Sequence, residues 1–112
     1  MSAVYVNNLV INTGTDFDKV FTLANSQGNA PLNLTGYTAE SKMAKHAGAA
    51  VKTTFNVAID APTTGIVAIG LTSGATASLK EGRYVYDVVL DDGTKKTRVI
   101  EGMVLVRRGV TD

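Results

Sequence analysis

Cysteine and tryptophan are both absent from this chain of 112 residues, and histidine occurs once. Without cysteine there are no disulfides and no thiolate metal sites, and the missing thiols fit a protein made in a reducing cytosol. The single histidine, His46, has no second imidazole or thiolate with which to share a transition metal. A histidine-based catalytic triad is disfavoured as well, because no serine lies in a nucleophile-elbow setting. We therefore expect no metal site.

The chain also lacks an excess of charge of one sign and lacks long apolar runs. Eleven Lys and Arg residues are balanced by ten Asp and Glu residues, for a net charge of +1. This balance disfavours nucleic-acid binding through phosphate contacts. No segment approaches the roughly 18 apolar residues of a membrane-spanning helix, and the N-terminus lacks the pattern of a signal peptide. We predict one domain over residues 1–112, with neither a nucleic acid nor a membrane as partner.

Strand patterns fill most of the chain instead. Val and Thr are abundant, and β-branched residues pack well on a pleated sheet. Turn signals recur about every ten residues, a spacing typical of sandwiches and barrels. We predict an immunoglobulin-like antiparallel β-sandwich of about seven strands, with a small barrel as the alternative. The predicted strands are residues 4–11, 17–24, 37–45, 51–59, 66–71, 83–91 and 96–106.

Several local features refine this prediction. The first strand does not alternate cleanly, which indicates a bulge or bend near Asn7-Asn8. In strand 51–59, Val51, Phe55, Val57 and Ile59 are expected to share one inward face. Thr72 is a suitable N-cap for one short helical turn near 72–79, which we interpret as a crossover between two sheets. Gly102 lies inside the last strand and indicates a bulge or a close approach of backbone.

The clearest pattern is a β-hairpin from Gly82 to Val106, with its turn at Asp92-Gly93. A tyrosine corner is expected at its start, where the hydroxyl of Tyr84 would tie the strand to the preceding loop. Both strands are apolar on both faces, which indicates either a central strand or an outer face that a partner covers. Contiguous outward apolar residues usually mark contact sites. The candidate partner-contact residues are Val85, Val89, Val99, Met103 and Leu105, together with Arg107 and Arg108.

The same region is locally basic. Lys95, Lys96, Arg98, Arg107 and Arg108 occur there against the single acid Glu101. One interpretation is a basic face for an acidic partner. The favoured interpretation is that Lys and Arg at a sheet edge block aggregation between sheets.

Two close pairs of acids, Asp16 with Asp18 and Asp91 with Asp92, could be considered as calcium ligands. Calcium needs about six or more oxygen ligands, which two short pairs do not supply. We therefore expect the first pair to be solvated and the second pair to form the hairpin turn.

Pairing in the predicted hairpin would bring Asp87 and Glu101 to similar heights on neighbouring strands. They could form a carboxylate pair for acid–base chemistry. The favoured interpretation is that each faces outward and pairs with Arg98, Arg83 or a partner protein. No nucleophile, cofactor loop or phosphate-binding glycine motif accompanies them. We predict that the protein is not an enzyme and uses no cofactor.

Several motifs, taken in order, carry a family resemblance. They include 12–17 (NTGTDF), 31–39 (PLNLTGYTA), 63–67 (TTGIV), 82–88 (GRYVYDV), Asp92-Gly93 and 101–104 (EGMV). In order and spacing they resemble the N-terminal domain family of phage baseplate upper proteins, a tail-associated β-sandwich that usually begins a longer protein and anchors it to the baseplate.

The resemblance implies a non-enzymatic virion structural protein, a tail, baseplate or neck adaptor that is assembled in the host cytoplasm. Its partners would be other virion structural proteins. Because virion proteins work as repeated copies, a homo-oligomer or symmetric array is expected. The alternatives are a capsid decoration (cement) protein and a carbohydrate- or host-surface-binding module. The absence of Trp and of a calcium constellation counts against the last of these.

Overall fold

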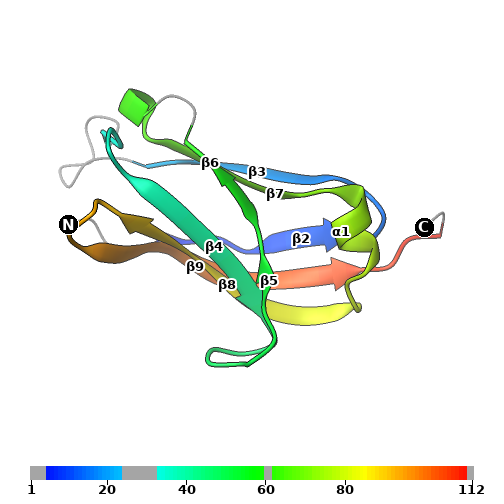
Figure 1. Cartoon of the computed structure of the whole chain (residues 1–112). Coiled ribbons are helices and arrows are strands. Elements are labelled where there is room, and N and C mark those ends of the chain that lie inside the picture. The colour runs from blue at the N-terminus through cyan, green and yellow to red at the C-terminus, as the bar shows by residue number, and fades with distance from the viewer. Residues whose placement is uncertain (1–4, 24–32, 60–61, 111–112) are drawn as a thin grey trace.

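The computed structural model describes residues 5–23, 33–59 and 62–110. Strands form two sheets that face each other, with one short α-helix at the end of the sandwich (Figure 1). The first residue of the predicted strand 4–11 and the last residue of the predicted strand 17–24 lie outside the described residues. The elements are β1 (Tyr5–Val6), β2 (Leu9–Asn12), β3 (Phe17–Thr22), β4 (Thr38–Ala44), β5 (Thr53–Thr54), β6 (Asn56–Ala58), a 3-10 turn (Pro62–Thr64), β7 (Ile66–Leu71), α1 (Ser73–Ala77), β8 (Gly82–Asp91) and β9 (Lys96–Arg107).

The strand order confirms the immunoglobulin-like sandwich. The larger sheet runs β1-β9-β8-β4-β5, with β2 also paired to β9, and the smaller sheet runs β3-β7-β6. The predicted hairpin is β8–β9, which pairs from Gly82 with Val106 to Asp91 with Lys96. Its turn contains Gly93 at a φ of 95°, a backbone conformation that glycine adopts without strain.

The antiparallel prediction is wrong for the first strand. β1 and β2 both pair with β9 in parallel, Tyr5 opposite Ile100 and Leu9 opposite Val104. The two ends of the chain thus run side by side in the same direction, a pairing between segments that no local turn connects. The predicted interruption at Asn7-Asn8 is confirmed, because it separates β1 from β2.

The predicted strand 51–59 is divided between the two sheets. β5 pairs with β4 in the larger sheet, whereas β6 pairs with β7 in the smaller sheet. Phe55 lies at the crossing, only 2% exposed, with its ring near those of Phe17 and Tyr86 at 5.9 and 6.3 Å. The inward position predicted for Val51 is wrong: it precedes β5 in a loop and is 84% exposed.

The core lies between the sheets, where alternating strand residues from both meet. Leu9 and Ile11 add the first strand to this core, which explains why the edge of the larger sheet closes over it. The buried apolar residues are Leu9, Ile11, Phe21, Leu23, Leu34, Met43, Phe55, Val67, Ile69, Leu71, Tyr86, Val88, Leu90, Val99, Ile100, Val104 and Val106.

The connection between β7 and β8 has the predicted form. Thr72 is the N-cap of α1, and its hydroxyl accepts a hydrogen bond from the backbone N–H of Ala75 at 3.3 Å. The helix carries the chain from the smaller sheet to the larger one. The Tyr84 hydroxyl donates to the carbonyl of Lys80 at 2.7 Å, which confirms the tyrosine corner.

Candidate functional site

The side of the larger sheet turned away from the smaller sheet carries most of the predicted contact residues, and we call it the outer face. Strand alternation sends every second side chain there. Its members in the middle of β8 and β9 are Val85, Asp87, Val89, Arg98, Glu101, Met103 and Leu105, and those from the other strands are Val6, Val10, Glu40 and Lys42. Toward the strand ends the same alternation adds Arg83, Asp91, Lys96, Thr38 and Ala44, of which Ala44 is only 9% exposed.

The prediction that Val99 is an outward contact residue is wrong. Val99 is 1% exposed and packs in the core, as does its neighbour Ile100. The pairing passes from Val88 opposite Ile100 to Val89 opposite Arg98, so a β-bulge leaves Val99 as an extra residue. The bulge reverses the alternation on β9 and turns two consecutive side chains inward.

Exposed apolar residues lie together at one part of the outer face. Met103 pairs with Val85 across β9 and β8, and Leu105 pairs with Val10 across β9 and β2. Their exposed fractions are 47%, 36%, 41% and 49% in that order. Because opposite residues in a ladder stand within about 5.5 Å of each other, these side chains form one contiguous apolar stripe.

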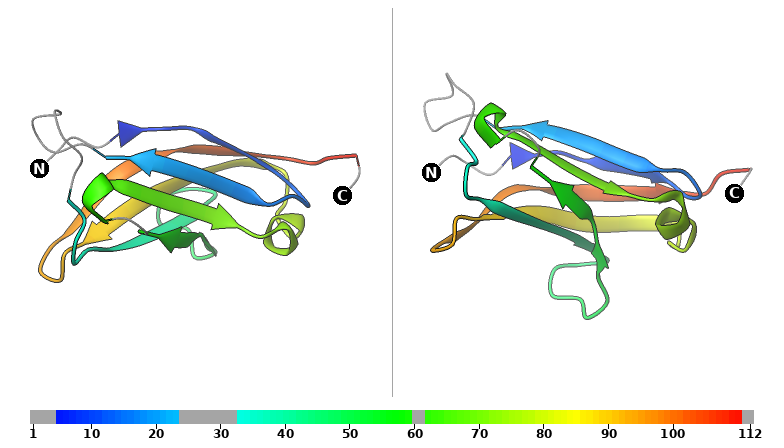
Figure 2. Two further views of the ribbon diagram at one scale, coloured as in Figure 1. Left: turned by 90° about the horizontal axis from the view of Figure 1, so that it is seen from above. Right: turned by 45° about the horizontal axis from the view of Figure 1, so that its top comes forward.

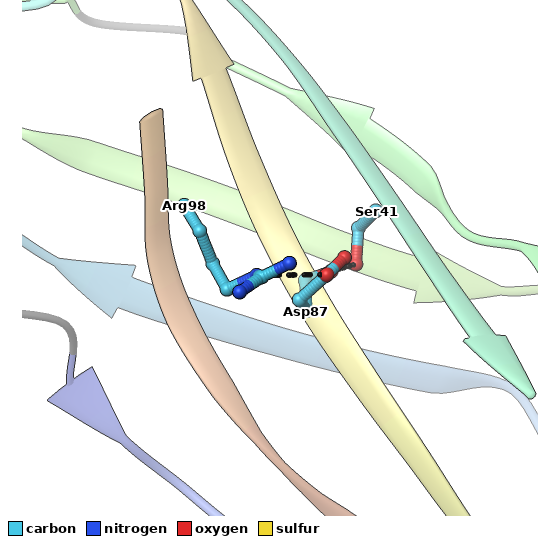
Figure 3. Close-up of polar contacts among 3 residues, drawn as sticks. All are labelled: Ser41, Asp87 and Arg98. Carbon is cyan, nitrogen blue, oxygen red and sulfur yellow. Dashed lines mark hydrogen bonds and ion pairs between the residues drawn. The ribbon is translucent and has the colours of Figure 1, made fainter. Parts of the chain in front are cut away.

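Charged side chains occupy the next rows of the outer face. Asp87 and Glu101 are register partners on β8 and β9, as predicted. The Asp87 carboxylate accepts a hydrogen bond from Arg98 Nε at 3.1 Å, and the Asp87 carbonyl accepts one from the buried Ser41 hydroxyl at 2.7 Å (Figure 3). Asp87 is thus held by the strands on both sides of it, and its carboxylate pairs with Arg98, one of the partners that the favoured interpretation named.

The segment 45–52 between β4 and β5 bounds this surface. It projects from the larger sheet away from the smaller one (Figure 2). His46, Ala47 and Gly48 line a cavity of about 600 Å³ whose floor is the outer face. His46 is exposed, as expected, with Nδ1 3.1 Å from the Ala47 carbonyl oxygen. The loop converts a flat sheet into a recess.

Arg107 and Arg108 lie at the end of β9, apart from this recess. Both are exposed, and Arg108 borders a separate hollow with Lys80 and Thr13. Lys96 stands at the opposite end of β9, about 37 Å away at the rise of an extended strand. The basic residues of the hairpin therefore do not form one patch.

β8 and β9 both contact the Asn7-Asn8 bend at the edge of the larger sheet. Tyr86 donates its hydroxyl to the Asn7 carbonyl at 2.6 Å, and burial raises the pKa of Tyr86 to about 12. A Cβ on Gly102 would come within 2.8 Å of the Asn7 carbonyl carbon and closer still to its oxygen. The predicted close backbone approach at Gly102 is confirmed. It is what allows the Asn7-Asn8 bend to sit against β9.

Sequence reasoning did not include Val6, Val10, Glu40 and Lys42 among the candidate contact residues, although all four lie on the outer face. The first two reach the face only through the parallel pairing with β9, for which the sequence carries no local signal. Glu40 and Lys42 could have been found from their alternation with the inward Ser41 and Met43. They make a surface ion pair at 3.8 Å.

Neither a metal-holding group of acids and histidines nor a membrane-spanning helix occurs among the described residues. Over 5–23, 33–59 and 62–110, no three His, Asp or Glu side chains gather as they would to hold a metal ion. Asp16 instead accepts a hydrogen bond from the backbone N–H of Ser73 at 2.7 Å, and Asp92 accepts from those of Thr94 and Lys95. Those two bonds lower the pKa of Asp92, with that from Lys95 the stronger. Within the same ranges, no helix has the length and apolarity to cross a membrane.

No protein-family model matches the chain, and no curated protein matches it.

Proposed function

We propose that this domain is a non-enzymatic phage virion structural protein, a tail, baseplate or neck adaptor that assembles through protein contacts on its outer face. The observation that carries the binding role is the apolar stripe of Val10, Leu105, Met103 and Val85 beside the recess. Monomeric proteins rarely expose contiguous apolar patches without a contact to make. The virion setting comes from the ordered motifs described above.

The composition of the outer face also suits a protein partner. The apolar stripe lies at one side of the outer face, and the ion pair of Asp87 with Arg98 lies beside it. Protein interfaces combine apolar and polar side chains in this way. Against an enzyme, no Ser, Thr or Cys is among the described residues that line the recess.

Particle incorporation tests the proposal. Met103→Glu and Val85→Glu each place a charge in the stripe, and we expect either variant to be lost from purified particles while remaining folded. Val20→Glu is the matched control, because Val20 is 56% exposed on the smaller sheet. Thermal unfolding of the isolated domain shows whether each variant folds.

Normal incorporation of both stripe variants would refute the assignment of this face. The same particles separate the alternatives: attachment to the tail supports the adaptor role, and attachment to the capsid shell supports a decoration protein. Binding of the isolated domain to a glycan array, lost in Met103→Glu, would favour a carbohydrate-binding module instead.

A further inference from the structure

The outer face has an internal order that the strand register makes visible. Across β9, β8 and β4, the outward side chains line up in rows perpendicular to the strands. The rows, each read in that strand order, are Met103–Val85–Ala44, Glu101–Asp87–Lys42 and Arg98–Val89–Glu40.

Two charges on β9 have the opposite charge at the same height on β4. Glu101 stands in the row of Lys42, and Arg98 stands in the row of Glu40. β8 runs midway between these two strands. A twofold axis along β8 would therefore lay β9 of one copy over β4 of another. It would bring Glu101 against Lys42 of the second copy and Arg98 against Glu40 of the second copy.

The residues on the axis fit the same arrangement. Val85 and Val89 would meet their own counterparts, and Met103 would meet the small Ala44 of the second copy. Asp87 would face Asp87 of the second copy, but each of these carboxylates already has Arg98 Nε at 3.1 Å in its own chain. Arg83 and Asp91, the outward residues at the two ends of β8, would also face their own counterparts: Asp91 has Lys96 as its register partner, and Arg83 lies beyond the end of β4 at the margin of the face. In the two rows of Val85 and Val89 apolar side chains meet on the axis, and Arg98 accompanies the like charges at Asp87.

The projecting segment 45–52 would also contact the second copy. It stands beyond β4, so the axis along β8 would place it over Leu105 and Val10 of the second copy. Ala47 and Gly48, which line the recess, are small enough to pack against these two exposed side chains. This would cover the remainder of the apolar stripe.

Other twofold axes in this face fit less well. An axis across the strands, between the rows of Asp87 and Val89, would set Met103 against Lys96 of the second copy. An axis between β8 and β9 would set Glu101 against Asp87 of the second copy. The first of these axes keeps Glu101 against Arg98 and Lys42 against Glu40, but it buries the apolar Met103 and Val85 against Lys96 and Asp91. The second opposes Glu101 to Asp87 twice in the dimer, which weakens association.

The size of the face suits a reversible dimer. Five strands at a spacing of about 4.8 Å span about 24 Å, and the eight residue steps from Arg83 to Asp91 span about 27 Å. Each copy would contribute on the order of 650 Å², so the two copies together would bury about 1,300 Å². This total exceeds the area of about 1,000 Å² that is expected of a specific interface. Affinity at this size is expected in the micromolar range.

We propose that the outer face pairs with the outer face of a second copy of this chain, about a twofold axis that runs along β8. This inference rests on the proposed function, in which the same face is a protein contact surface. An isologous interface needs a surface that is complementary to itself, which the rows of this face provide.

A charge exchange across the axis tests the pairing. Analytical ultracentrifugation of the wild type is expected to show dimers with a Kd of about 1–100 µM. Glu101→Lys and Lys42→Glu should each raise Kd by about tenfold or more, because each opposes like charges twice per dimer. The double variant Glu101→Lys/Lys42→Glu should return Kd to within about threefold of the wild type. Glu81→Lys, on an exposed residue away from the face, is the matched control and should leave Kd unchanged.

Cross-linking gives an independent measurement of the axis. The chain has no cysteine, so Val85→Cys introduces a single thiol at the axis. A short bifunctional maleimide should join two copies of this variant efficiently, and should not join copies of the control Val20→Cys. A monomeric wild type at about 500 µM, or a double variant no better than either single variant, would overturn the inference.

The two proposals fail separately. If the wild type is monomeric but Met103→Glu is lost from particles, the face binds another virion protein and the dimer inference is wrong. If the charge exchange restores the dimer but Met103→Glu enters particles normally, the dimer stands and the proposed function is wrong.

Discussion

Replacing Gly102 by alanine tests how the edge of the larger sheet is held together. The added Cβ would lie 2.8 Å from the Asn7 carbonyl carbon and 3.1 Å from the Asn8 side-chain oxygen. Carbon and oxygen atoms in proteins usually approach no closer than about 3.3 Å. The bend at Asn7-Asn8 would therefore have to move outward, away from β9.

The cost follows from the hydrogen bonds that this movement disrupts. Asn7 N–H donates to the Glu101 carbonyl at 3.0 Å, Met103 N–H donates to Asn8 Oδ1 at 3.0 Å, and the Tyr86 hydroxyl donates to the Asn7 carbonyl at 2.6 Å. At about 0.5–1.5 kcal/mol each, their loss destabilises the fold by about 2–4 kcal/mol. The entropic gain from replacing a strand glycine is at most about 1 kcal/mol and does not offset this.

Urea denaturation measures the effect. For a domain of this size the unfolding slope is about 1–3 kcal/mol per molar urea, so the midpoint of Gly102→Ala should fall by roughly 1–2 M. Gly74→Ala is the matched control: a Cβ there meets nothing within 4 Å, and helix propensity predicts a gain of up to about 1 kcal/mol. If Gly102→Ala unfolds within about 0.5 kcal/mol of the wild type, the close approach of Asn7 to β9 is wrong.

Two further predictions concern buried hydroxyls. Tyr86→Phe leaves the Asn7 carbonyl without its donor, and the free energy of unfolding should fall by about 1–3 kcal/mol in urea denaturation. Because the fold raises the pKa of Tyr86 from 10.0 to about 12, the contribution of the protonated Tyr86 hydroxyl to the free energy of unfolding is complete below pH 10 and is lost as the pH rises toward 12. The free energies of unfolding of the wild type and of Tyr86→Phe, plotted against pH, should converge over that window. Parallel curves would contradict the assignment. Thr76→Val removes a fully buried hydroxyl that donates to the carbonyls of Thr15 at 2.7 Å and Ser73 at 3.1 Å, and should cost about 1–3 kcal/mol by thermal or urea unfolding, whereas an unchanged stability would show that α1 is not tied to the turn before β3.

The alternation of apolar residues predicted most of the sandwich because its strands are long enough for a period of two to be visible. Phe21 in β3 and Leu23 just after it, and Val67 and Ile69 in β7, are buried as their spacing indicates. The hairpin turn and the N-cap at Thr72 could also be predicted, since both depend on residues within a few positions of each other.

What the sequence could not predict depends on contacts between distant segments. Val99 is buried because a bulge against Val88 and Val89 shifts the register, and nothing near Val99 marks that shift. Val51 is exposed because β5 begins only at Thr53, so Val51 lies in the preceding loop although it continues the apolar alternation of the segment. The position of Val6 on the candidate face follows from parallel pairing between the two ends of the chain.

The structure bears on both explanations for the doubly apolar hairpin strands. β8 is central in its sheet, but the sandwich has only two layers, so its second face still meets solvent. A central position therefore accounts for Val88 and Val104, which are buried, and leaves the exposed Met103 and Leu105 unexplained. Strand propensity does not account for them either, because neither is β-branched or aromatic. Contact with another protein is the explanation that we propose for this apolar surface, and a second copy of the same chain is the partner that we infer from the charged rows beside it.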